Sequence, residues 1–343
     1  MTSKDQGSPS NRASAGRCTA MTAKGSPCKN PATEEGGLCP IHQKARKSGP
    51  PPMESWSPSL SPDRKSSLAE SLAEFRDWVG RRMRGDYVVD DWGFDEEFTQ
   101  KFYPLIKWMY KKYWRVTATG LENVPAKGRA LLVANHSGVL PFDGAMVIMA
   151  ILEEHPEPRL VRALVLSLFF GLPFTGTMLQ RVGQVQASPT NSERLLEADE
   201  LALVFPEGVK GIGKPFRRRY QLARFGRGGF VRVALKTQSP IIPVSIVGAE
   251  EIYPQIFNLK PVASLFGLPY MPITPTFPWL GPLGAIPLPT KWYIHFGEPI
   301  PIPEMKYRPS EEPLLVTKIS NQVRDTIQRQ IFERLKTRRS VFW

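Results

Sequence analysis

Cysteine and histidine are scarce in this sequence. Of its 343 residues, three are Cys, all before residue 40, and four are His. No disulfide can therefore brace a core built from the rest of the chain, and this usage is typical of a reducing compartment. The first residues, "MTSKDQGSPSNRASAGR", contain no apolar run of the kind found in a secretory signal. Both absences argue against a secreted, disulfide-stabilised protein.

Long hydrophobic runs are also missing. The longest are residues 163–174 and 144–152, whereas a membrane-spanning helix needs about 18 residues or more. We therefore expect no transmembrane helix. We expect a peripheral or monotopic protein on the cytoplasmic side of a membrane.

Charge is absent from residues 261–290, "PVASLFGLPYMPITPTFPWLGPLGAIPLPT". The spacing of its prolines excludes a continuous helix. Such a segment is either a lid packed over the core or a surface that meets lipid or acyl chains. The aromatic, uncharged composition favours the second interpretation.

What the chain has in excess is positive charge. Its formal net charge is +13, and 41% of its residues are hydrophobic, enough for one large core. Such a charge favours anionic partners: nucleic acid, acidic lipid headgroups or phosphorylated small molecules.

The N-terminal residues 1–64 are rich in Ser, Pro, Gly and Lys, and we expect a flexible tail. Residues 17–44 contain all the cysteines and one histidine. Three thiolates and one imidazole suit a tetrahedral structural Zn²⁺ site, with Cys18, Cys28, Cys39 and His42 as ligands. Their spacing is wider than in the commonest zinc fingers, so a tail with incidental thiols is the alternative.

Residues 65–114 are predicted to form amphipathic helices. Apolar residues recur every three or four positions from Leu68 to Met83 and again from Phe98 to Tyr110. The second segment ends in "KWMYKKYWR", which mixes aromatic rings with lysines. These helices either pack on the core with a basic rim or lie on an anionic membrane surface.

Residues 115–343 alternate short Val-, Ile- and Leu-rich runs with helical patterns. Continuous apolar strands between helices predict an α/β fold with a mostly parallel central sheet flanked by helices. Such sheets place their chemistry beyond the carboxyl ends of the strands. His136 and Glu207 both follow predicted strands.

The stretch "NHSGVLPFD" is the first candidate for chemistry. A histidine at a strand end is well placed as a general base, and a carboxylate on its other ring nitrogen improves it. Asp143 supplies that carboxylate if the loop after His136 folds back. The alternative is a structural histidine, with Asp143 as a charge in the first turn of a helix.

A second candidate is "FPEG", where Glu207 would enter the same crevice and Gly208 permits a sharp turn. The following "GVKGIGKP" is similar to a phosphate-binding loop but has Pro215 where Ser or Thr is needed, which excludes a nucleotidase. Residues 210–232 are strongly basic and suit phosphates. Pro243 interrupts the next apolar run, which predicts a strand end shaped for a neighbour or a ligand.

Together "NHSGVLPFD", "FPEG" and "PIIPV", in this order, resemble the phospholipid/glycerol acyltransferases over about residues 115–300. The uncharged loop is similar to a bacterial branch close to the mono- and diacylglycerol acyltransferases. Two features depart from the family pattern. Six residues separate His136 from Asp143 where four are usual, and Lys210 stands where an arginine commonly follows the Glu-Gly pair.

The resemblance implies an O-acyltransferase that moves a fatty acyl group from acyl-CoA or acyl carrier protein to a glycerolipid hydroxyl. No cofactor takes part in that step. His136 would be the base, Asp143 its partner, and backbone amides near the loop would stabilise the oxyanion. The implied substrate-binding residues are Asn135, Ser137, Arg181, Glu207, Gly208, Lys210 and Pro243.

Two rival interpretations remain. An inactive lipid-binding scaffold would share the fold but not need His136, Asp143 and Glu207. A nucleic-acid-binding protein would explain the basic charge and the cysteine-containing segment. It would not explain polar residues at buried strand ends or an uncharged loop, so nucleic acid is the less favoured partner.

Overall fold

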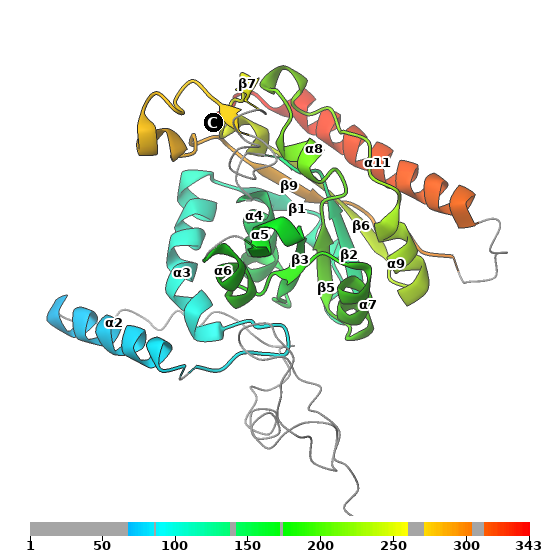
Figure 1. Ribbon diagram of the computed structural model, residues 1–343. Helices are drawn as coiled ribbons and strands as arrows, with labels where there is room; N and C mark the ends of the chain where they lie inside the picture. Colours follow the sequence, from blue (N-terminus) through cyan, green and yellow to red (C-terminus); the bar gives the residue numbers. More distant parts are fainter. Residues whose placement is uncertain (1–67, 86, 138–141, 172–173, 260–270, 304–311) are drawn as a thin grey trace, which may run out of the picture.

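The fold is built around one seven-stranded sheet. The structure, a computed structural model, describes residues 68–343 except 86, 138–141, 172–173, 260–270 and 304–311. The strand order is β1-β9-β6-β2-β5-β3-β4, and all neighbouring pairs are parallel except β6 with β9 (Figure 1). The strands are β1 Thr117–Thr119, β2 Ala130–Ala134, β3 Val161–Val165, β4 Val185–Gln186, β5 Leu201–Val204, β6 Ile241–Val247 and β9 Tyr293–Phe296. The predicted α/β class is confirmed.

The central strand β2 shows why the sequence forms this sheet. It pairs with β5 on one side and β6 on the other, and all five of its residues are buried. Leu131 and Val133 pack into one hydrophobic cluster, whereas Leu132 and Ala134 pack into another. An uninterrupted apolar strand is what a sheet covered on both faces requires.

Helices form a layer on each face of the sheet. One cluster contains side chains of α3 (Glu96–Trp108) and α4 (Phe142–Glu154), and the other contains those of α9 (Gly229–Thr237) and α11 (Glu312–Thr337). Shorter helices connect the strands: α5 Ser167–Gly171, α6 Thr175–Arg181, α7 Pro189–Glu197 and α8 Val209–Ile212. A separate two-stranded ribbon joins β7 (Phe257–Asn258) to β8 (Pro272–Ile273).

Helices occupy both amphipathic N-terminal segments. α2 spans Leu68–Met83, and α3 continues into a π-helix at Met109–Tyr113. The side chain of Asp95 caps α3 by accepting a hydrogen bond from the amide of Phe98 at 2.9 Å, and it also pairs with the buried Arg82. No helix within the described ranges is long and apolar enough to cross a membrane.

Ion pairs connect the C-terminal end of α4 to α3 and to the π-helix that continues it. Lys107 lies 3.0 Å from Glu153, and Lys111 lies 2.8 Å from Glu154. Glu154 also accepts a hydrogen bond from the hydroxyl of Tyr110 at 3.0 Å. The end of α4 opposite to Asp143 is therefore held in place.

The expectation that Pro243 interrupts a strand is wrong. β6 runs without a break from Ile241 to Val247, and Pro243 lies opposite Val133 of β2. The ladder between β6 and β9 begins only at Val244, and the carbonyl of Pro243 accepts from the amide of Gly297 at 2.8 Å. Proline has no backbone N–H to donate, and at Pro243 the ladder with β9 does not need one. A central strand therefore tolerates the proline at this position.

The predicted zinc ligands and the tail of residues 1–64 lie outside the described residues, as does part of the uncharged loop. The described part of that loop contains the turn of 3₁₀-helix η6 at Gly281–Ala285. The end of the uncharged loop is fixed to the π-helix that continues α3 and to the residue after it. The side chains of Tyr113 and Trp114 donate hydrogen bonds to the carbonyls of Pro287 and Leu288 at 2.5 and 3.1 Å.

Candidate active site

The site begins where β2 ends. Asn135 follows the strand directly, is fully buried, and donates from its side-chain amide to the carbonyl of Ile246 at 3.0 Å. Its side-chain oxygen accepts from the amide of Ile246 at 2.7 Å. Both polar groups of Asn135 are therefore occupied in joining β2 to β6, and this bond fixes where the next residue, His136, leaves the sheet.

His136 and Asp143 form a close pair. Nδ1 of His136 lies 2.7 Å from Oδ2 of Asp143, whose side chain is fully buried, while the histidine side chain is 16% exposed. The carboxylate also accepts from the amides of Ser137 and Gly144, each at 2.9 Å. Asp143 thus reaches His136 despite the six residues between them, and it lies in the first turn of α4.

This pairing fixes the tautomer of His136. A carboxylate only accepts hydrogen bonds, so Nδ1 of a neutral imidazole carries the proton. Nε2 is then left with a lone pair, and the side chain is partly exposed. This is the arrangement that a histidine needs to accept a proton from a substrate hydroxyl.

Two neighbours restrict the position of the imidazole. Phe205, at the end of β5, stacks on it with ring centroids 4.3 Å apart and planes 25° apart. On the main-chain side lies Gly211 of α8, where an added Cβ would lie 2.8 Å from the Cβ of His136 and 2.9 Å from that of Glu207. Only glycine fits there without a displacement of His136.

Glu207 reaches His136 through the main chain. Its side chain has no exposed surface. One carboxylate oxygen accepts from the amide of His136 at 3.0 Å, and the other accepts from the amide of Ala223 at 2.6 Å. The carboxylate therefore holds the backbone at the base of the site. The sequence instead predicts that Glu207 faces the crevice.

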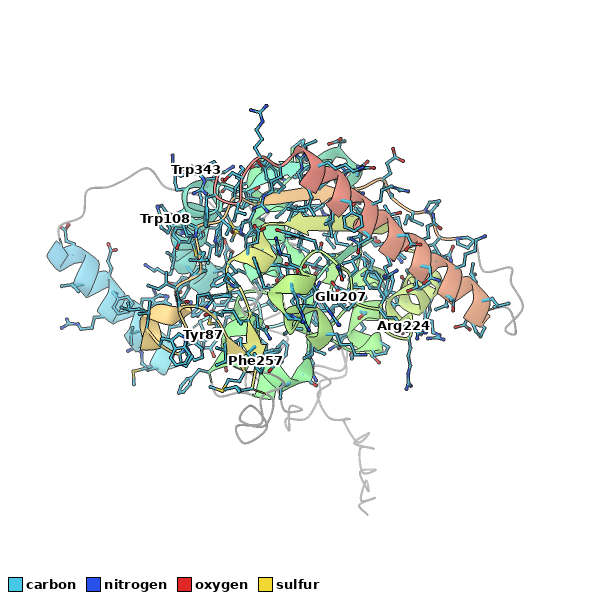
Figure 2. All side chains as sticks on the ribbon, turned by 90° about the horizontal axis from the view of Figure 1, so that it is seen from above. Tyr87, Trp108, Glu207, Arg224, Phe257 and Trp343 are labelled. Carbon is cyan, nitrogen blue, oxygen red and sulfur yellow. The ribbon has the colours of Figure 1, made fainter. Side chains whose placement is uncertain are left out.

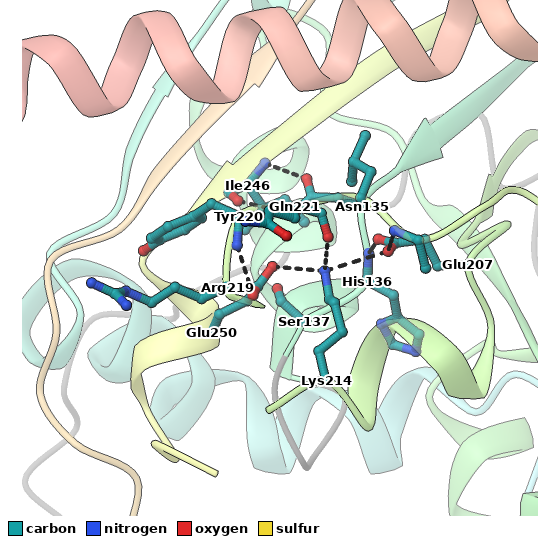
Figure 3. Close-up of polar contacts among 12 residues, drawn as sticks. Asn135, His136, Ser137, Glu207, Lys214, Arg219, Tyr220, Gln221, Ile246 and Glu250 are labelled. Atoms are coloured by element: carbon teal, nitrogen blue, oxygen red, sulfur yellow. Dashed lines mark hydrogen bonds and ion pairs between the residues drawn. The ribbon is translucent and has the colours of Figure 1, made fainter. Parts of the chain in front are cut away.

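Lys214 lies between two buried carboxylates. Its ammonium group is 3.3 Å from Glu207 and 3.0 Å from Glu250, and it donates to the carbonyl of Gln221 at 3.1 Å (Figure 3). The side chains of Lys214 and Glu250 are only 10% and 7% exposed. Burial raises the pKa of Glu250 above its usual range, and the charge of Lys214 opposes that rise.

The segment after Lys214 is anchored on its other side. Glu250 accepts from the amide of Tyr220 at 2.9 Å. Gln328 of α11 donates to the carbonyl of Tyr220 at 2.8 Å and accepts from the amide of Leu222 at 2.9 Å. The backbone of the basic segment is thus fixed to both the sheet end and α11.

Three backbone amides at the predicted oxyanion site donate within the protein, while residues 138–141 of the loop lie outside the described residues. The amides of His136, Ser137 and Gly144 already donate to Glu207 or Asp143, so none of the three is free to meet an oxyanion. Ser137 keeps one free polar group. Its hydroxyl is buried and has no hydrogen-bond partner within the described part of the chain.

The other predicted residues take different places. Gly208 adopts φ +54°, a conformation that side chains disfavour, and leads into α8, where Lys210 is exposed. Arg181 lies over the rings of Tyr87 and Phe98, at 4.9 and 5.4 Å from their centroids. Its contacts are with the N-terminal segment, and the structure does not bring it to His136.

The described ranges contain no group of three or more His, Cys, Asp or Glu residues that is suited to a metal ion. The polar residues at the site are instead paired among themselves. Lys214, Glu250 and Phe205 are the neighbours that sequence reasoning missed. Lys214 and Glu250 are separated by 35 residues that contain no signal for their pairing.

Comparisons with known proteins relate the chain to acyltransferases. The acyltransferase family model matches residues 115–247. An uncharacterised protein of Mycobacterium tuberculosis is 47% identical over 279 residues, which cover 81% of this chain and 78% of that protein. A bovine protein described as a DGAT1/2-independent enzyme synthesizing storage lipids is 24% identical over 53% of this chain and 51% of its own length. The crystal structure of the LPA acyltransferase PlsC of Thermotoga maritima aligns with a TM-score of 0.46 at 20% identity, over 71% of this chain and 80% of that one.

Proposed function

Because the chain belongs to the acyltransferase family and is an acyltransferase enzyme, we propose that it acylates a hydroxyl of a glycerolipid at His136. The donor is a fatty acyl thioester, and the acceptor is a lysophospholipid, lysophosphatidate, or mono- or diacylglycerol. The observation that carries the proposal is the contact of 2.7 Å between His136 and the buried Asp143. The name of the bovine relative supports a lipid alcohol as acceptor.

In the proposed mechanism, Nε2 of His136 takes the proton of the acceptor hydroxyl as its oxygen attacks the thioester carbonyl. Asp143 keeps the ring oriented and stabilises the imidazolium that forms. The tetrahedral intermediate collapses with cleavage of the C–S bond, and the imidazolium returns the proton to the leaving thiolate. The ester and the free thiol are the products, and no metal or redox group takes part.

We further propose that the enzyme lies on an anionic membrane surface. Large apolar side chains are exposed on both α3 and the loop that adjoins it. They are Phe102, Leu105 and Trp108 on α3, and Trp279, Leu280, Leu283 and Ile286 on the loop. Lys111 and Lys112 stand exposed beside them. Apolar side chains rimmed by lysines are typical of surfaces that seat in a lipid headgroup layer.

The decisive test of the catalytic proposal is acyl transfer by the purified protein. Radiolabelled long-chain acyl-CoA or acyl carrier protein is offered with each acceptor, and products are separated by thin-layer chromatography. His136→Ala should abolish the product. His295→Ala is the matched control, since His295 of β9 contacts Thr119 of β1, and β6 separates β9 from the strand that leads to His136. Turnover that survives in His136→Ala would favour the scaffold interpretation.

The membrane proposal is tested by vesicle flotation. Leu283→Glu should weaken binding to phosphatidylglycerol vesicles about ten-fold or more, because it places a charge in the apolar layer. Leu314→Glu changes an even more exposed leucine, at the start of α11, and should bind like the wild type. Equal binding by both variants would contradict the proposed surface.

For residues 17–44, we propose that Cys18, Cys28, Cys39 and His42 bind one Zn²⁺ with a structural role. Elemental analysis of the purified full-length chain should give about one zinc per chain, and Cys39→Ser should lose it. Zinc well below one equivalent in the wild type would contradict this site.

A further inference from the structure

The main-chain amide of His136 is bound by a carboxylate from another part of the fold. Glu207, which follows β5, accepts this amide at 3.0 Å with one oxygen and the amide of Ala223 at 2.6 Å with the other. Its side chain has no exposed surface, and in Figure 2 it lies near the centre of the molecule, whereas Trp108 and Trp343 lie at the edge. The position of the His136 backbone therefore depends on how this carboxylate is held.

Lys214 is the cation that faces this carboxylate. Its ammonium group lies 3.3 Å from Glu207, 3.0 Å from Glu250 and 3.1 Å from the carbonyl oxygen of Gln221 (Figure 3). An ammonium group has three N–H donors, so each of them has a partner inside the protein. Lys214 also borders a groove of about 670 Å³, but no donor of its ammonium group is left for a ligand there.

Glu250 joins this ion pair to the end of β6. It lies in η5 (Ala249–Glu251), the turn of 3₁₀-helix after that strand, and its side chain is 7% exposed. The same strand holds Asn135 through the main chain of Ile246. Two successive residues, Asn135 and His136, are thereby connected to the end of β6, the first directly and the second through three buried charged side chains.

The charges explain why the carboxylate keeps both amides. Each oxygen of Glu207 accepts one N–H, and a carboxyl group can do so only while it carries no proton. Without the ammonium group of Lys214, two buried carboxylates would share the site with no cation between them, which is costly in an interior of low dielectric constant. Glu207 would then turn toward water or take up a proton. In either case the amide of His136 or of Ala223 loses its acceptor.

We propose that Lys214 and Glu250 are positioning residues for the base. This inference rests on the proposed function, in which Nε2 of His136 takes the proton of the acceptor hydroxyl. Lys214 and Glu250 act through Glu207, whose carboxylate fixes the backbone from which the imidazole projects. Proton transfer needs the two heavy atoms within about 3 Å of each other, so a small displacement of this backbone slows the chemical step and leaves substrate affinity unchanged.

The test is steady-state kinetics on Lys214→Met and Glu207→Gln, with a palmitoyl thioester and the acceptor that the wild type turns over. At a temperature where calorimetry shows both variants folded, each should lower kcat about ten-fold and leave KM within about two-fold of the wild type, because a charge-assisted hydrogen bond is lost. The double variant should be no slower than the slower single variant, since both changes release the same amide. Lys236→Met, whose ion pair with Glu193 is exposed, is the matched control and should keep the wild-type kcat.

Hydrogen exchange follows the same contacts without turnover. In Lys214→Met, the amides of the peptide that spans residues 131–137 should exchange faster by a larger factor than those of β3, which report opening of the whole sheet. If Lys214→Met does not fold, Glu250→Gln replaces it in both measurements. That variant keeps the volume of the side chain and removes one carboxylate from the ammonium group, so its loss of kcat should be smaller but again non-additive with Glu207→Gln.

Three results would overturn the inference. The first is a folded Lys214→Met protein with the wild-type kcat. The second is an effect on KM alone, which would place Lys214 against the substrate. The third is a double variant whose loss is the product of the two single losses, because Lys214 would then not act through Glu207. A wild type without turnover refutes the proposed function instead. Exchange in residues 131–137 that rises no more than in β3 then refutes the positioning role by itself.

Discussion

Removing the charge of Lys214 should destabilise the fold strongly. Lys214→Met keeps the length of the side chain but leaves Glu207 and Glu250 without the cation that lies 3.3 and 3.0 Å away. All three side chains are at most 10% exposed, so water cannot replace the lost partner. Breaking a buried ion pair of this kind costs about 3–5 kcal/mol. At about 2 °C per kcal/mol for a chain of this size, Tm should fall by roughly 6–10 °C.

The loss should depend on pH in a defined direction. Burial already raises the pKa of Glu250 above its usual value of 4.5, and removal of Lys214 raises it further. A carboxyl whose pKa is higher in the folded than in the unfolded state favours folding when protonated, and this advantage declines as pH rises from the unfolded pKa through the folded one. The deficit in Tm should therefore be smaller at about pH 5 than at about pH 8.

The measurement is differential scanning calorimetry at both pH values, with Lys236→Met as the control. Lys236 lies 2.6 Å from Glu193, closer than either contact of Lys214, but its side chain is 60% exposed. Solvent screens such a pair, so its loss should leave Tm nearly unchanged. A Lys214→Met protein with the wild-type Tm at about pH 8 would refute the reasoning.

Three further predictions concern His136. Asp143→Asn should keep the fold but reduce kcat on the order of 10³-fold, because an amide can hold the wrong tautomer of the ring; an unchanged kcat would exclude the proposed dyad. Gly211→Ala should lower both Tm and kcat, because its Cβ would lie 2.8 Å from that of His136, and a fully active variant would show that α8 can move. Phe205→Leu should lower kcat more than it raises KM, because the ring 4.3 Å from the imidazole is lost, and a pure KM effect would contradict a role in orienting the base.

The sequence carried enough information for the sheet and for the pairing of His136 with Asp143. The alternation of apolar strands and helices predicts the parallel sheet, because burial on both faces demands uninterrupted apolar strands. A histidine after β2 and a carboxylate in the first turn of α4 lie near each other whenever that loop is short. The contact between His136 and Asp143 depends on local geometry, which can be predicted from the number of residues between them.

Contacts made across the sheet could not be predicted in the same way. In the sequence, Lys214 is one of many lysines and arginines in a basic segment. Only the fold shows that it is buried between Glu207 and Glu250. Pro243 suggests a strand break in the sequence. The strand continues because β9 does not pair with β6 at Pro243, and that depends on the position of β9. Arg181 is expected to bind substrate only through the family resemblance, and its stacking on Tyr87 depends on a segment nearly a hundred residues earlier.

The inward contacts of Glu207 have a consequence for how this enzyme can diversify. Its carboxylate holds the amides of His136 and Ala223, so the groups that prepare the base form an internal frame with no surface toward the substrate. Exposed positions nearby, such as Lys210 and Arg218, can then change while this frame stays constant. A designer who wishes to change the substrate should leave the Glu-Gly motif intact and vary the rim.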